Sequence, residues 1–345
     1  MTLIYFILIL GITVLIHEFG HYLMAKKAGV YVYEFSIGMG PRLFKWNRKN
    51  DETEYSIRIL PIGGYVSLAG EEEEKNPKVP KGRQLQDKSF IQNILIMGAG
   101  VFNNFLLALF LLFIVGLFNG YTETKPIVST VVDDSPAYIA GIEVGDRITS
   151  LNGHHINNTD KLLLELTTIS DENITLEIDR DGSKKQISLN ANRETDEDGN
   201  VSYKMGFTLD NTNSKGIGYA IKYAFTKFGS LVEQMVFILI YLFSGKLSVN
   251  NLSGPVGIYV LVGSVAKQGL INLVYLMGYI SLNVGIINIL PFPAFDGGRI
   301  FLLILEKIRG KKLSQKIENS INTVGFILLM LLMIYVTFND ILHLF

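Results

Sequence analysis

Four long apolar runs, almost free of charged side chains, constrain this chain more than any other feature. They cover residues 3–25, 94–118, 271–290 and 321–338. An α-helix rises about 1.5 Å per residue, so each run can cross most or all of a hydrocarbon core about 30 Å thick. Because 48% of the residues are hydrophobic and they come in blocks, we predict a polytopic α-helical membrane protein with about four transmembrane helices.

The distribution of basic residues predicts the orientation of these helices. Lys and Arg are frequent in segments 26–58 and 299–316, which places both segments in the cytoplasm and the long segment 119–270 outside. The first run could also be a signal peptide, but Met1–Leu3 carries no basic side chain and no small-residue cleavage pattern follows. A net charge of −1 gives no reason to expect nucleic acid as a partner. The absence of cysteine excludes disulfides and thiolate metal ligands.

The segment 217–245 does not fit a four-helix scheme. It is nearly long enough to span, but Lys222, Lys227 and Glu233 interrupt it, and the remaining run 235–243 is too short to cross the bilayer. We therefore predict an amphipathic helix on the outer membrane surface. The alternative is a six-span topology, in which this segment and a second one at about 255–270 both cross.

A small outer domain is predicted between the second and third runs. Residues 125–132 and 174–189 alternate apolar and polar positions, as half-buried strands do. Between them, DSPAYIAGIEVGDRITSLNG (134–153) resembles the PDZ domains of bacterial membrane and periplasmic proteases. That resemblance implies an extracytoplasmic α+β domain that binds peptide termini by adding a strand to a sheet edge. The alternative is a β-rich spacer without a ligand.

These patterns predict four regions. Residues 1–118 contain the first two transmembrane helices, 119–212 the PDZ-like domain, 213–270 the membrane-surface region, and 271–345 the last two transmembrane helices.

The motif HEFGH within the first run predicts a metal site. His17 and His21 are four residues apart, so both imidazoles lie on one face of a helix and can bind one zinc ion. Glu18 lies beside them and could take a proton from water. Ionisable groups inside a membrane span are costly and usually functional. The alternative is a polar cluster that pairs within the helix bundle.

A third ligand is predicted at the end of the third run, because catalytic zinc usually has three protein ligands and one open position. Pro291 and Pro293 should end that helix, and Asp296 follows on the side where the first run also ends. The alternative is that Asp296 only caps a helix at 297–309. His154 and His155 lie in the outer domain and His343 near the C-terminus, so they do not compete.

Together these motifs resemble the site-2 proteases, which are intramembrane zinc metalloproteases, and in particular their bacterial RseP-type branch. NILPFPAFDGG (288–298) matches the family pattern N-x-x-P-x-P-x-x-D-G, and PIGGYV (61–66) matches a membrane-entering β-hairpin. LSGPVGI (252–258) matches a stretch before the third span. GVFNN (100–104) resembles the G-x-x-x-N signature of the second span, with Val101 where a proline is usual. Only one PDZ-like domain is predicted, whereas the well-known relatives have two.

The resemblance implies a site and a set of partners. Zn²⁺ would be held by His17, His21 and Asp296, with Glu18 as the general base. Further residues implied to contact substrate or the developing oxyanion are Asn288, Asn104 and, at the tip of the hairpin, Gly63, Gly64 and Tyr65. Asn288 could instead bond a helix neighbour, and the hairpin could lie plainly on the cytoplasmic surface. The implied substrates are transmembrane segments of single-pass proteins, such as anti-sigma factors or signal-peptide remnants, cut in the bacterial cytoplasmic (inner) membrane.

Two other classes of function remain open from the sequence. One is a catalytically inactive membrane scaffold that binds peptides through the PDZ-like domain. The complete HExxH motif together with Asp296 argues against it, since an inactive relative is expected to lose a ligand or Glu18. The other is a transporter, which can also have broken helices, but the sequence shows no inverted repeat.

Overall fold

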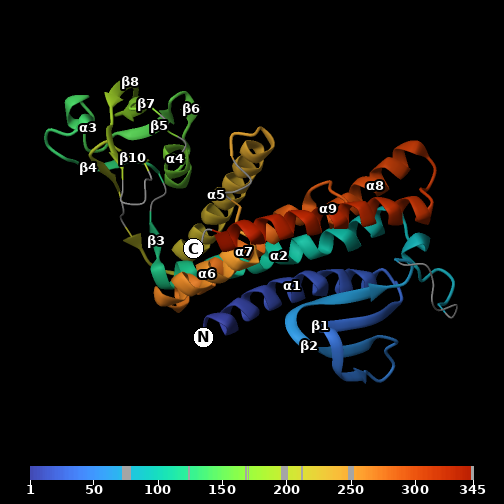
Figure 1. Cartoon of the computed structure of the whole chain (residues 1–345). Helices are drawn as coiled ribbons and strands as arrows, with labels where there is room; N and C mark the ends of the chain where they lie inside the picture. Colours follow the sequence, from blue (N-terminus) through green and yellow to red (C-terminus); the bar gives the residue numbers. More distant parts are fainter. Residues whose placement is uncertain are drawn as a thin grey trace. The chain divides into compact units, whose positions relative to one another are not determined.

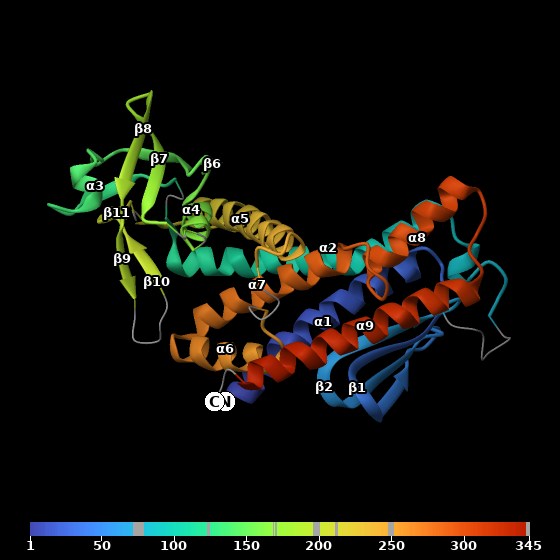
Figure 2. The same cartoon turned by 45° about the horizontal axis from the view of Figure 1, so that its top comes forward.

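The computed structural model describes residues 1–71, 79–122, 125–167, 169, 171–195, 201–210, 213–247 and 252–342 (Figures 1 and 2). The chain divides into two compact units. One contains Met1–Val115 and Met235–Phe345, and the other contains Gly116–Gln234.

Long helices dominate the first unit. They are α1 (Thr2–Lys27), α2 (Phe90–Asn119), α6 (Pro255–Lys267), α7 (Leu270–Ile289), α8 (Asp296–Arg309) and α9 (Gln315–Leu342). Helices α2 and α5 (Ile217–Phe243) continue across the boundary between the units. A short 3₁₀ turn at Leu85–Asp87 precedes α2. All four predicted runs therefore lie within helices, except that the third ends one residue after α7.

Among the described residues, five helices are long and apolar enough to cross a membrane. Four of them, α1, α2, α7 and α9, contain the four predicted runs, and the fifth is α5. Many of their apolar side chains face outward; on α9, for example, Leu331 is 59% exposed. Such an apolar surface suits lipid rather than water. The surface position predicted for 217–245 stays a prediction. Helix α6 is apolar but shorter than these five helices.

The two strands β1 (Val32–Asn47) and β2 (Glu54–Leu68) form a curled antiparallel sheet against α1 (Figures 1 and 2). Residues 34–37 of β1 pair with two parts of β2, residues 54–57 and residues 64–67. The sequence pattern placed Gly63–Tyr65 at the tip of a hairpin, and this is wrong. Gly64 and Tyr65 lie inside the sheet, where they pair with Ile37 and Ser36. Their partner strand is β1, not the first half of β2 as a hairpin centred on these residues would require.

The end of α7 and the start of α8 bring the chain back sharply. Helix α7 ends at Ile289, before Pro291, as expected from the missing N–H of proline. A Cβ on Gly297 would lie 2.2 Å from the carbonyl oxygen of Ile289, and one on Gly298 would lie 2.2 Å from that of Phe292. The two glycines therefore let the first turn of α8 pack directly on the preceding loop.

The second unit is mainly β-structure around its own apolar core, which includes Ile148, Leu162 and Leu176. A four-stranded sheet has the order β6 (His154–His155), β5 (Arg147–Leu151), β7 (Asn173–Arg180) and β8 (Ser183–Asn190). Three further strand pairs join β9 (Asn192–Thr195) with β10 (Val201–Lys204), β4 (Val128–Val131) with β11 (Phe207–Leu209), and β3 (Tyr121–Thr122) with β12 (Asn213–Ser214). Helices α3 (Pro136–Ile139) and α4 (Thr159–Leu166) complete it.

Polar residues that interrupt α5 have partners inside this unit. Lys227 forms an ion pair of 2.7 Å with Asp160 on α4. Glu233 accepts a hydrogen bond of 3.1 Å from the side chain of Asn157, just before α4. These contacts give a structural reason for charges in an otherwise apolar helix. They fix the first part of α5 to α4.

Candidate metal centre

Three side chains with metal-binding atoms meet inside the first unit. Helix α1 presents His17 and His21 on one face, and their Nε2 atoms are 3.1 Å apart. Oδ2 of Asp296, the first residue of α8, lies 3.0 Å from Nε2 of His17 and 3.3 Å from Nε2 of His21. One ligand atom from each residue lies within 4.8 Å of the others. Both histidines are buried, so these atoms are largely shielded from bulk solvent.

The donor set fits a zinc ion. Nδ1 of His21 lies 2.8 Å from the backbone oxygen of Ile96, which can only accept, so the ring proton is on Nδ1 and the lone pair is on Nε2. Oδ2 of Asp296 is buried and has no conventional hydrogen-bond donor among the described residues. Two imidazole nitrogens and one carboxylate oxygen are ligands that zinc commonly takes, with a fourth position left open.

Glu18 shares a cavity with these residues. The cavity has a volume of about 300 Å³, and its lining includes His17, His21, Asp296 and Asn288. Oε2 of Glu18 accepts a hydrogen bond of 3.3 Å from the backbone N–H of Val66 in β2. The carboxylate is thereby held beside the two histidines.

Of the further residues predicted to contact substrate, the structure places Asn288 in the cavity lining and the others outside it. Asn288, on the last turn of α7, lines the cavity. Among the described residues, the cavity lining contains Val66 and Leu68 of β2 but neither Tyr65 nor Asn104. Asn104 is fully buried, and its side-chain nitrogen lies 3.3 Å from Nδ1 of His17, on the outer side of that ring.

The other histidines lie elsewhere. His154 is in the second unit, where its Nδ1 lies 3.0 Å from a carboxylate oxygen of Glu165, and His155 is exposed on β6. His343 lies outside the described residues.

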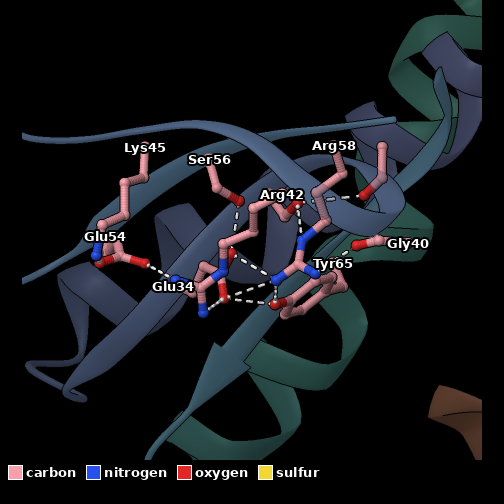
Figure 3. Close-up of polar contacts among 10 residues, drawn as sticks. Glu34, Gly40, Arg42, Lys45, Glu54, Ser56, Arg58 and Tyr65 are labelled. Carbon is pink, nitrogen blue, oxygen red and sulfur yellow. Dashed lines mark hydrogen bonds and ion pairs between the residues drawn. The ribbon is translucent and has the colours of Figure 1, made fainter. Parts of the chain in front are cut away.

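The side chain of Tyr65 points into a polar network on the sheet instead (Figure 3). Its hydroxyl donates to Oε2 of Glu34, and Oε1 of Glu34 accepts from Ser56 at 2.5 Å and from Arg58 at 2.8 Å. Arg42 also reaches Glu34, at 3.4 Å. The network joins the β2 segment beside Glu18 to the rest of the sheet.

The charges in this network shift two pKa values in opposite directions. Burial raises the pKa of Glu34, but hydrogen bonds from Ser56, Tyr65 and Arg58 outweigh it, so the net pKa lies below the ordinary glutamate value. Burial and the hydrogen bond to Glu34 raise the pKa of Tyr65 to about 12. Glu34 is therefore ionised and Tyr65 neutral at neutral pH, which keeps the tyrosine as the donor.

Sequence reasoning missed an ion pair at the edge of the cavity. Arg299 pairs with Glu71, and both line the cavity. Arg299 is in the first turn of α8, three residues after Asp296, and Glu71 follows the end of β2. The basic residue directly after FDGG was a visible signal for Arg299, whereas nothing in the sequence marked Glu71 as its partner.

Comparison with known proteins agrees with this geometry. The model of peptidase family M50 matches residues 5–332. A protein of Clostridium perfringens named as a zinc metalloprotease is 38% identical and aligns over 99% of both chains. One of Fusobacterium nucleatum with the same description is 36% identical over 100% of both chains. The regulator of sigma-W protease RasP of Bacillus subtilis is 30% identical, covering 100% of this chain and 99% of its own.

One solved structure, a PDZ domain of an SdrC-like protein from Listeria innocua, is 19% identical and covers 26% of this chain and 97% of its own, with a TM-score of 0.22. At that TM-score it says nothing about the fold of the second unit. The family match and the full-length relatives, by contrast, cover nearly every residue, the HEFGH helix and FDGG included. This chain belongs to peptidase family M50 and is a membrane-embedded zinc metalloprotease.

Proposed function

We propose that His17, His21 and Asp296 hold the zinc ion and that Glu18 is the general base of peptide hydrolysis. The convergence of three ligand atoms within 4.8 Å, with Glu18 in the same cavity, carries this proposal. Zinc in such a site supplies Lewis acidity that brings the pKa of water toward neutrality. Glu18 takes the proton of the attacking water and passes it to the nitrogen of the leaving amine.

The cavity supports roles for two further elements. Asn288 lines it from α7, where its amide N–H can donate a hydrogen bond to the substrate carbonyl as negative charge develops on that oxygen. The β2 segment with Gly63, Gly64 and Tyr65 leads directly to Val66, whose N–H reaches Glu18. A substrate segment unwound into a strand would pair with this edge and pass beside the histidines.

The substrates that fit are transmembrane segments of single-pass proteins, including anti-sigma-factor-like proteins and signal-peptide remnants. The reason is that Glu18 and both histidines lie on α1, a helix apolar enough to cross a membrane. A helical peptide bond in lipid has its polar groups satisfied internally, so the substrate must unwind at the site before water attacks. The name of the B. subtilis relative, a regulator of sigma-W protease, agrees with this class.

The proposed location is the bacterial cytoplasmic (inner) membrane, with the metal site toward the cytoplasmic half and the second unit outside. The basic segments 26–58 and 299–316 support this orientation. The regions 1–118, 119–212, 213–270 and 271–345 are proposed as the functional divisions of the chain.

The second unit is proposed to act as a PDZ-like filter or peptide-binding domain. It has a cavity of about 720 Å³ lined by Leu162, Leu163 and Leu166 of α4 and by residues of β11. A helix whose apolar side chains face a strand is suited to an extended peptide. If the unit filters substrates by size, trimming a substrate's outer domain should speed cleavage; equal rates for trimmed and full-length substrates would count against the filter.

Cleavage of a single-span test substrate by purified protein in detergent tests the main proposal. Wild type should cut it and Glu18→Gln should not, while both retain zinc. Equal cleavage by both proteins would show that Glu18 is not the base. If neither cuts any single-span substrate but the second unit binds peptides, the alternative of an inactive scaffold would be supported instead.

A further inference from the structure

Helix α2 holds the outer ring nitrogens of both histidines. The backbone oxygen of Ile96 lies 2.8 Å from Nδ1 of His21, and the amide of Asn104 lies 3.3 Å from Nδ1 of His17. In zinc sites, a partner on the outer nitrogen fixes which nitrogen carries the proton and how the ring is oriented. For His21 that partner is an acceptor, so its Nε2 is free to bind metal.

The orientation of the Asn104 amide decides which ring nitrogen of His17 carries the proton. Asn104 is fully buried, its nitrogen faces His17, and its oxygen has no hydrogen-bond partner among the described residues. The oxygen and nitrogen of an amide exchange places when the group turns by half a rotation. With the oxygen toward His17, Nδ1–H of His17 donates to it. Nε2 of His17 then keeps its lone pair toward Oδ2 of Asp296.

Two further contacts hold the backbone around Asn104 in place. The hydroxyl of Ser281 on α7 donates a hydrogen bond of 2.9 Å to the backbone oxygen of Asn104. The side chain of the neighbouring Asn103 donates a hydrogen bond of 3.2 Å to the backbone oxygen of Ile16, directly before His17. The backbone around Asn104 is therefore held to both α7 and α1, which keeps this residue beside His17.

Gly100 lies between Ile96 and Asn104 on the face of α2 that contacts the histidines, because residues 96, 100 and 104 are four apart. A Cβ on Gly100 would lie 2.5 Å from Nε2 of His21 and 2.7 Å from Nε2 of His17. It would occupy the space beside the atoms that are proposed to bind zinc. The glycine therefore keeps the metal position open.

We infer that the G-x-x-x-N pattern of α2 serves the metal rather than the substrate. Asn104 is a positioning residue that accepts the Nδ1 proton of His17, and Gly100 leaves room for the ion. This inference rests on the proposed zinc ligands, and it replaces the substrate contact that the sequence predicted for Asn104.

Zinc affinity tests it independently of catalysis. The full-length chain is purified in detergent with Glu18→Gln, and its dissociation constant for zinc is measured by competition with a chromophoric chelator. Asn104→Ala should weaken zinc binding by about 10- to 100-fold. Asn104→Asp keeps an acceptor at His17 and should stay within a few-fold of the parent. Gly100→Ala should weaken binding strongly, while Gly98→Ala, where a Cβ has nothing within 4 Å, should not.

Three results would overturn the inference. One is an unchanged zinc affinity in Asn104→Ala together with a lower kcat when Asn104→Ala is made in the active protein, in which Glu18 is retained. That result would make Asn104 a substrate contact. Another is equal loss in the Ala and Asp variants, which would mean that the amide nitrogen donates to His17. The third is unchanged affinity in a folded Gly100→Ala protein. Failure of the zinc ligands themselves would be seen separately, as full zinc content in His17→Ala.

Discussion

The backbone N–H of Val66 in β2 donates a hydrogen bond of 3.3 Å to Oε2 of Glu18 in α1. It links the strand proposed to bind substrate to the proposed base. Among the described residues, this backbone donor is the one hydrogen bond that Glu18 makes to β2.

Val66→Pro should lower kcat by roughly 10- to 100-fold, because it removes a hydrogen bond to a charged group worth about 1.5–3 kcal/mol. Proline is tolerated where a strand's N–H does not bond a neighbouring strand. Val66→Ala keeps the N–H and is the matched control. Cleavage of the single-span substrate is measured for both; similar rates in the two variants would show that the N–H does not position Glu18.

Asp296→Ala should abolish stoichiometric zinc binding and cleavage together. The change leaves His17 and His21 without the carboxylate oxygen that lies 3.0 and 3.3 Å from their Nε2 atoms. Metal analysis of the purified protein checks it. Removal of zinc from the wild type with a chelator should likewise stop cleavage, and added zinc should restore it; a variant that still holds one zinc per chain would exclude Asp296 as a ligand.

Gly64→Ala should impair both folding and cleavage. A Cβ at this position would lie 2.4 Å from the backbone oxygen of Ser36, so β2 must move away from β1 just before Val66. Gly229→Ala in α5, where a Cβ meets nothing within 4 Å, is the control and should behave like wild type. Thermal unfolding in detergent and cleavage are measured together, and a normal melting temperature with normal cleavage in Gly64→Ala would contradict the close packing.

Glu34→Gln should destabilise the protein at neutral pH by roughly 1–3 kcal/mol, because it removes a buried charge with several hydrogen bonds. Glu54→Gln, in the same sheet but more exposed and paired with Arg42 and Lys45, should cost less than about 1 kcal/mol. The comparison is made by thermal unfolding in detergent.

The effect of Glu34 should also depend on pH. Its folded-state pKa lies below the ordinary value of 4.5, so its contribution is complete above that pH and is lost as the pH falls through the folded pKa. The difference in melting temperature between Glu34→Gln and wild type should therefore shrink in acid. A difference that stays constant down to strongly acidic pH would show that the charge of Glu34 is not responsible.

Local spacing in the sequence predicted the elements that carry the chemistry. The separation of His17 and His21 by four residues places them on one face of any helix, and α1 is that helix. Pro291 ends α7 wherever the helix lies in the fold. The apolar runs predicted α1, α2, α7 and α9 because their length and composition leave few other structures open in lipid.

Only the tertiary structure decided what surrounds those elements. Tyr65 points to Glu34 rather than to the cavity, because β1 pairs with two parts of β2 in a register that no local pattern specifies. Asn104 and Gly100 face the histidines because α1 and α2 pack with Gly20 against the backbone of Ala99. Helical and strand periodicity act over a few residues, whereas these contacts depend on how distant segments pack. The sequence by itself therefore determined which residues can bind a metal, and packing decided which others position them.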